Sequence, residues 1–178
     1  MTTPDHVSLI RKSRGAILKF ALIGLAVIAL GAFLTWILTC PCERMPGGYL
    51  LGDVVEEPIN DWTFANQVPL CQIQISGLLP HAINLNCMAT AQGNLYLSCS
   101  ACAPKYWSGQ VQENSRSRIR LDGNVYPVNI TRVTEQTEMD QAWQARIDKL
   151  QVVSGPGNPA VPVGTPRPDS WWTFRVQS

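Results

Sequence analysis

Residues 85–133 read LNCMATAQGNLYLSCSACAPKYWSGQVQENSRSRIRLDGNVYPVNITRV, and this stretch decides the fold. Apolar and polar residues alternate in three runs, which is the pattern of β-strands with one buried face. Asp122-Gly123 predicts a tight hairpin turn between two of these strands, because Gly accepts the positive φ that such turns need. Pro104 predicts the first turn of a short helix, where its missing N–H costs nothing. The stretch therefore predicts antiparallel strands with one short helix inserted.

A second hairpin is predicted just upstream. In the sequences CQIQI and INLNC, apolar residues alternate with Gln or Asn. If the runs fold antiparallel with Ile75 opposite Ile83, Cys71 faces Cys87 and every apolar side chain lies on one face. Directly opposed residues have Cβ atoms ~4.5–5.5 Å apart, near the spacing of a disulfide. We therefore expect a Cys71–Cys87 disulfide, with two buried reduced thiols as the alternative.

The chain has six cysteines, an even number that fits an oxidising compartment. Cys99-Ser100-Ala101-Cys102 is a C-x-x-C motif. A thioredoxin-like redox motif opens a helix within a βαβ unit, whereas this one ends an alternating strand, so a local disulfide or a structural turn is favoured. Half of a zinc site is the other alternative, and it needs a second pair of soft ligands. Cys40 and Cys42 are interpreted as structural thiols or as a tether between anchored protomers.

The N-terminal region predicts a membrane anchor. Residues 1–19 carry an excess of basic residues, and residues 20–39 contain no charge. At 1.5 Å per residue, such a run spans a hydrocarbon core of about 30 Å. This apolar run is longer than the ~7–15-residue apolar core of a cleaved signal peptide, and Ile37-Leu38-Thr39 is a poor lipoprotein signal before Cys40. The charge asymmetry puts the N-terminus in the cytoplasm and the rest outside, which is the periplasm in a Gram-negative cell.

The remaining sequence predicts a linker and one folded domain. Residues 40–48 form a Pro/Gly-rich linker, and residues 49–178 form the domain. Trp62 and Phe64 are expected to close one end of its core. A helix is expected from Thr137, with an apolar stripe at Met139, Trp143, Ile147 and Leu150. Residues 170–176, SWWTFRV, predict a final strand.

The order of GNLYL, the KYW segment, RIRLDGNVY and RVTE resembles a known family. It is similar to the split β-barrels of the pyridoxamine 5′-phosphate oxidase-like superfamily, and most of all to the deazaflavin-dependent nitroreductase-like group. The resemblance covers roughly residues 47–178. It implies a mainly β fold, a split β-barrel with one or two packed helices, here preceded by a single transmembrane helix. It also implies a dimer with a flavin-type cofactor, FMN or a deazaflavin, in a cleft at the interface.

The resemblance further implies where the cofactor would bind. In the family a Ser or Thr at the end of the LYL strand and a following cation hold the phosphate, which here correspond to Ser98, Ser100 and Lys105. Trp107 would lie against the ring. Arg116, Arg118 and Arg120 alternate along one strand and share a face, so they are either a solvated surface or an anion site. Two departures from the family are that no basic residue occurs on the strand before GNLYL and that the predicted topology puts this domain outside the cytoplasm, where family members usually work. The C-S-A-C insertion also lies where the phosphate would bind.

Composition and motifs exclude several functions. A net charge of +1 and the absence of a basic stripe with aromatics argue against a nucleic-acid partner. Only two histidines occur, so neither a Ser-His-Asp triad nor a zinc hydrolase site is indicated. Two hypotheses remain. One is a membrane-anchored, oxidoreductase-like domain that binds a flavin-type cofactor. The other is a cofactor-free barrel that serves as an accessory subunit of a membrane complex.

Overall fold

The computed structural model describes residues 6–39, 41, 45–155 and 158–178, and of residues 6–16 only the backbone. Cys40 and Cys42, with their predicted tether, lie outside the described residues. The chain divides into two compact units at Ile37/Leu38.

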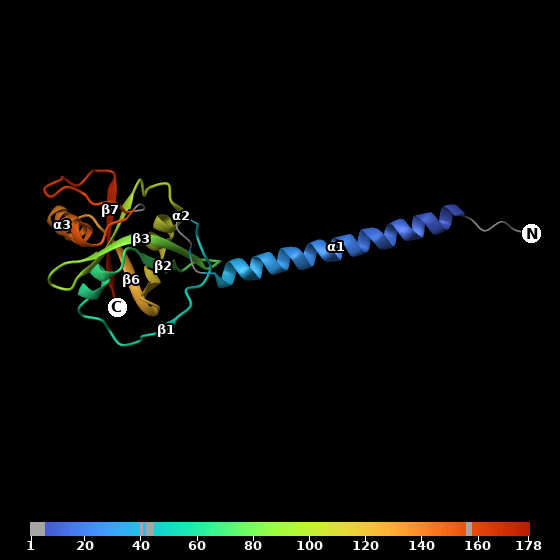
Figure 1. The fold of residues 1–178 in the computed structure, drawn as a ribbon, viewed down its shortest axis with the longest axis horizontal. Coiled ribbons are helices and arrows are strands. Elements are labelled where there is room, and N and C mark those ends of the chain that lie inside the picture. The colour runs from blue at the N-terminus through green and yellow to red at the C-terminus, as the bar shows by residue number, and fades with distance from the viewer. Residues whose placement is uncertain (1–5, 40, 42–44, 156–157) are drawn as a thin grey trace, which may run out of the picture. The chain divides into compact units, whose positions relative to one another are not determined.

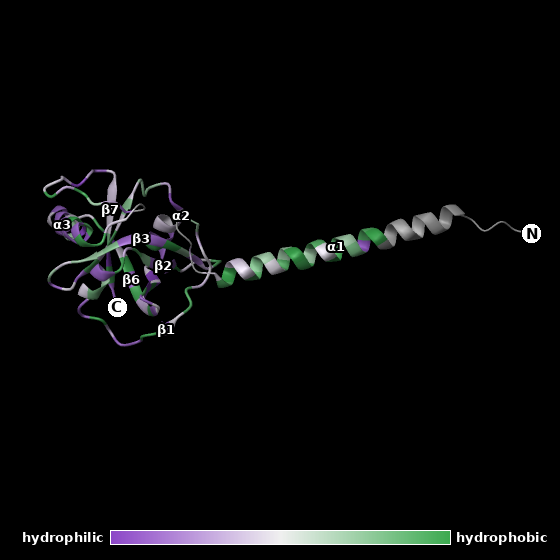
Figure 2. Cartoon of the chain, viewed as in Figure 1, coloured by the Kyte–Doolittle hydropathy of each residue, from purple (hydrophilic) through white to green (hydrophobic). Residues whose placement is uncertain are grey.

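The first unit is helix α1, His6–Leu38. Within it, Ile17–Leu38 has a mean hydropathy of 2.5 and is long and apolar enough to cross a membrane. Figure 2 shows this part of the helix as largely hydrophobic. Its apolar side chains, such as Phe20 and Leu30, are exposed along its length. A helix that is apolar on all sides suits the interior of a membrane, where every face of the helix meets lipid and not water.

The second unit is a closed antiparallel barrel of six strands (Figure 1). Its strands are β2 (Cys71–Ile75), β3 (His81–Ala89), β4 (Leu95–Ser100), β5 (Arg116–Leu121), β6 (Asn124–Val133) and β7 (Trp171–Gln177). The neighbour order is β6-β5-β2-β3-β4-β7, and β7 pairs again with β6. Strand β6 closes the ring because Asn124–Asn129 pair with β5 and Asn129–Val133 pair with β7. The predicted mainly β fold, a barrel preceded by an apolar helix, is confirmed.

The Asp122-Gly123 turn is also confirmed. It joins β5 to β6, and its two residues have φ angles of 47° and 86°. Two successive positive φ angles are those of a type I′ turn, whose twist matches that of the flanking strands.

The predicted register of the β2–β3 hairpin is wrong by two residues. Cys71 pairs with Leu85 and Ile75 with His81, rather than with Cys87 and Ile83. A shift of two residues keeps every side chain on its predicted face, so the burial pattern could not detect it. Cys71 and Cys87 nevertheless form a disulfide, with Cα atoms 5.7 Å apart. They are diagonal neighbours, and the twist of paired strands brings one diagonal closer than the other.

The barrel interior is filled by side chains from every strand. Ile73, Leu97, Ile119, Ile130 and Phe174 are fully buried there. At one end Trp62 packs edge-on against Tyr126 at 5.2 Å and stacks on Phe64 at 5.7 Å, as predicted. Trp62 and Phe64 belong to the segment around the short 3-10 helix η1 (Thr63–Gln67).

Two helices cover the barrel. Helix α2 (Tyr106–Glu113) follows β4, and helix α3 (Gln136–Val152) follows β6. The Glu135 side chain caps α3 by accepting hydrogen bonds from the backbone N–H groups of Thr137 and Glu138. In the predicted stripe of α3, Trp143, Ile147 and Leu150 are buried and Met139 is half-buried.

Residues 47–55 form a strap across the outside of the barrel. Gly47 exchanges two backbone hydrogen bonds with Ala82 on β3, and the Leu50 N–H donates to the Gln74 side chain on β2. The strap ends as the two-residue strand β1 (Asp53–Val54), which pairs in parallel with β6. Leu50 is buried with Ala82 and Val125, so the strap closes a small outer core.

Candidate functional site

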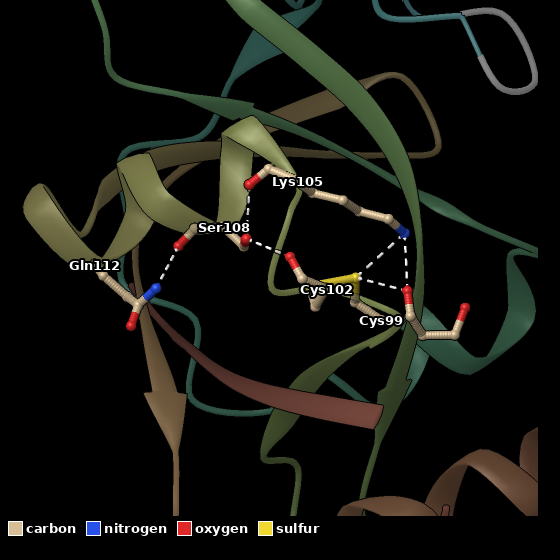
Figure 3. Close-up of a disulfide and its surroundings, with 6 residues drawn as sticks. Cys99, Cys102, Lys105, Ser108 and Gln112 are labelled. Carbon is tan, nitrogen blue, oxygen red and sulfur yellow. Dashed lines mark hydrogen bonds between the residues drawn. A yellow bond between two sulfur atoms is a disulfide. The ribbon is translucent and has the colours of Figure 1, made fainter. Parts of the chain in front are cut away.

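Ser98, Ser100 and Lys105, the predicted phosphate-binding residues, lie where β4 ends and α2 begins, a region we call the β4–α2 corner (residues 98–108). Cys99 and Cys102 form a disulfide there, with Cα atoms 5.6 Å apart. Ala101 between them has a φ of 45°, an uncommon conformation for a residue with a side chain. The Lys105 ammonium donates to the carbonyl oxygen of Ser100 at 3.0 Å and lies 3.5 Å from the Cys99 Sγ (Figure 3). The structure thus holds the Lys105 ammonium against the backbone of Ser100.

The corner is held by a network inside α2. Ser108 is fully buried, and its Oγ lies 2.7 Å from the Cys102 carbonyl oxygen and 2.8 Å from that of Lys105 (Figure 3). The Gln112 side-chain amide donates to the Ser108 carbonyl at 3.0 Å. These bonds hold the backbone from Cys102 to Ser108, and with it the backbone of Lys105.

The two sulfurs of the corner are not at the surface. Cys99 and Cys102 are 3% and 1% exposed. Thiol–disulfide exchange requires direct attack of a thiolate on a sulfur atom, so it needs access. The structure thus has a local disulfide at this motif, which the sequence pattern favoured over a redox motif. Among the described residues, no group of three or more His, Cys, Asp or Glu side chains is placed to hold a metal ion.

Ser98 lies on the outer face of β4, paired with Asn86 of β3 and Thr173 of β7. It is 2% exposed, and its hydroxyl has no hydrogen-bond partner; the Oδ1 atom of Asn86 is also buried without a partner. Buried polar atoms are nearly always paired, so two orphaned atoms on directly paired residues call for an explanation. A small polar group or ordered water between them would supply the missing bonds.

Trp107 is not placed where the resemblance puts it. Its side chain is 4% exposed and belongs to the main core, where its ring packs 5.0 Å from that of Phe174. Trp107 anchors α2 to the barrel, and it offers no exposed flat surface to a ring system in this structure.

The arginine row is confirmed as a shared outer face. Along β5, Arg116, Arg118 and Arg120 alternate with buried Ser117, Ile119 and Leu121. Arg120 donates to the Gln72 side chain at 3.1 Å. It lines an open groove of about 490 Å³ together with Val68, Pro69, Leu70, Gln72, Asn84, Asp122 and Gly123. Arg116 and Arg118 do not line this groove, and neither do Ser98 and Lys105. The groove therefore does not combine the arginine row with the predicted phosphate-binding residues.

Sequence reasoning did not single out Lys149, a lysine that is buried in the domain. Lys149 of α3 is 5% exposed, and its ammonium donates to the carbonyl oxygens of Ala65 at 2.8 Å and Cys87 at 2.6 Å. Burial lowers the pKa of Lys149 to about 8. The sequence does indicate this burial. Ala142 and Ala145 precede Lys149 at helical spacing and mark a second buried line of α3 that continues to Lys149.

Arg146 lies on the same buried line. Its guanidinium carbon is 4.7 Å from the ring centre of Trp171 and 5.1 Å from that of Trp143, and it donates to the Asn158 side chain at 3.0 Å. Burial lowers the pKa of Arg146. These contacts fix α3 and the segment after it against β7.

Comparison with known proteins gives a limited result. No protein-family model matches the chain, and no curated protein matches it. Among solved structures, it is similar to a Listeria innocua protein provisionally described as a pyridoxamine 5′-phosphate oxidase. The identity is 12% and the TM-score 0.43, over 63% of this chain and 85% of that one. At these values the similarity says nothing about the chemistry of this chain.

Proposed function

We propose that this chain is a membrane-anchored, extracytoplasmic split β-barrel that binds a flavin-type cofactor, FMN or a deazaflavin, and is oxidoreductase-like. The observation that carries the proposal is the pair of orphaned polar atoms, Ser98 Oγ and Asn86 Oδ1, beside the β4–α2 corner. The same strand carries Ser100 two residues on, where the Lys105 ammonium is fixed. Hydroxyls and a cation at one corner suit a phosphate group.

The residues fit the phosphate end of such a cofactor better than its ring. Lys105 and Ser98 would hold the phosphate, and Ser108 would keep Lys105 in place through the backbone of α2. When bound, the flavin would supply hydride or electron transfer. Its flat walls would have to come from residues other than Trp107, and a second copy of the chain in a homodimer is the source that the sequence resemblance implies.

The test is the absorbance spectrum of the full chain, purified in detergent, followed by addition of FMN and of a deazaflavin. We expect a band between roughly 370 and 450 nm that is released on denaturation, or an increase in melting temperature on adding one of the cofactors. Lys105→Met and Ser98→Ala should weaken binding at least tenfold, whereas Ser154→Ala, an exposed serine beyond α3, should not. A featureless spectrum with no thermal shift contradicts cofactor binding.

The second candidate is a cofactor-free barrel that serves as an accessory subunit of a membrane complex. The burial of Trp107 in the core and of Ser98 beneath the surface favours it, because a ligand would need both to be reachable. In that case the orphaned atoms hold ordered water, and the spectrum and the melting temperature are unaffected by either cofactor.

A further inference from the structure

The most exposed apolar side chain of the barrel unit lies at the tip of the β2–β3 hairpin. The loop between the strands is Ser76-Gly77-Leu78-Leu79-Pro80, in which Leu78 is 98% exposed and Leu79 48% exposed. Tyr106, at the start of α2 and 55% exposed, contacts the base of the hairpin. Its ring lies 5.3 Å from that of His81, and a Cβ at Gly77 would be 3.2 Å from its hydroxyl.

A cation borders the same tip. The hydroxyl of Ser76 donates to the carbonyl oxygen of Arg116 at 2.7 Å, which places the first residue of β5 beside the hairpin. The side chain of Arg116 is exposed. We call Leu78, Leu79, Tyr106 and Arg116 the hairpin patch. Aliphatic residues at a tip, with a tyrosine and an arginine behind them, are the composition of protein surfaces that enter the interfacial layer of a membrane.

The chain itself indicates what covers this patch. Leu38 is the last residue of the candidate span, and the carbonyl oxygen of the next residue, Thr39, accepts a hydrogen bond from the Gly48 N–H at 3.0 Å. The neighbouring Gly47 exchanges hydrogen bonds with Ala82, two residues after the hairpin loop. The point where the chain enters the barrel unit and the hairpin are thus joined by two steps of backbone hydrogen bonding. In Figure 1, helix α3 lies at the opposite end of the barrel from the start of the strap.

We propose that the hairpin patch docks on the lipid surface of the membrane that holds α1, with Leu78 and Leu79 among the acyl-chain ends and Arg116 at the phosphate headgroups. The inference rests on the proposed membrane anchoring. The docking would set the orientation of the barrel on the membrane. An arginine at headgroup level also favours anionic over neutral lipid.

The test is photocrosslinking in the full chain. p-Benzoylphenylalanine is introduced separately at Leu78, at Leu30 within the candidate span, and at Val152, which is 85% exposed at the end of α3. Each protein is reconstituted in nanodiscs of phosphatidylethanolamine and phosphatidylglycerol, irradiated, and analysed for lipid adducts by mass spectrometry. We expect adducts at Leu30 and at Leu78, with the yield at Leu78 at least fivefold above that at Val152.

The outcomes separate the inference from its premise. Adducts at Leu30 with only the Val152 yield at Leu78 overturn the docking and leave the anchor intact. No adducts at Leu30 refute the anchor, and the docking falls with it. Arg116→Gln should lower the adduct yield at Leu78 in nanodiscs that contain phosphatidylglycerol and leave it unchanged in neutral phosphatidylcholine. If the substitution changes the yield equally in both lipids, or in neither, Arg116 has no part in the docking.

Discussion

The two disulfides should stabilise the barrel by different amounts, because they close loops of different length. Cys71–Cys87 joins residues 16 apart, and Cys99–Cys102 joins residues 3 apart. In the chain-entropy model, a loop of that first length is worth about 3 kcal/mol and the second about 1.6 kcal/mol of unfolding free energy. All four cysteines are at most 3% exposed, so replacing either pair by alanine removes buried sulfur in both cases. The difference between the two double variants therefore reports mainly on loop length.

The assay is thermal and denaturant unfolding of the full chain in detergent, followed by tryptophan fluorescence. Cys71→Ala/Cys87→Ala should lower the melting temperature by about 6–12 °C, and Cys99→Ala/Cys102→Ala by about 3–6 °C, given about 2–4 °C per kcal/mol for a domain of this size. Refolding the wild-type protein in the presence of a reductant removes both bonds, so it should lower the melting temperature by about the sum of the two changes. The reasoning is refuted if the short-loop variant is destabilised as much as the long-loop variant, or if neither pair is oxidised in the purified protein.

Two further predictions concern the barrel unit. The unfolded chain binds more protons than the folded one between pH about 8 and 10.5, because burial lowers the pKa of Lys149. Stability should therefore rise with pH in this window, by up to about 3 kcal/mol, relative to a Lys149→Met variant; parallel pH profiles contradict this. Gly93→Ala should cost more than 1 kcal/mol in denaturant unfolding, since Gly93 has a φ of 82° and a Cβ would lie 2.9 Å from the backbone of Asp61, whereas Gly109→Ala, with open space around it, should be neutral or stabilising.

The elements of the fold could be predicted because each has a local signature. Period-two alternation marks the strands, Asp122-Gly123 marks the turn, and the apolar run of residues 20–39 marks the helix. Strand register could not be predicted to better than two residues. Loop length between β2 and β3 decides it, and Ile73 is buried in either register.

The candidate site was less predictable, because long-range packing sets it. The resemblance places Trp107 against a cofactor ring, but the helix that carries it turns the side chain into the barrel against Phe174, which is distant in sequence. The buried line that starts at Ala142 and Ala145 indicates that Lys149 is covered, but it does not indicate which groups bind its ammonium. Its burial depends on the carbonyls of Ala65 and Cys87, neither of which leaves a mark in the sequence.

The two disulfides need an oxidising compartment, so the topology of the chain is the central claim to test. Fusions of alkaline phosphatase and of a green fluorescent protein to Ser178, expressed in a Gram-negative bacterium, measure it directly. Because residues 1–19 carry the positive charge, we expect active phosphatase and no fluorescence, with the barrel outside the cytoplasm. Inactive phosphatase together with a fluorescent fusion would place the barrel in the cytoplasm and contradict the account.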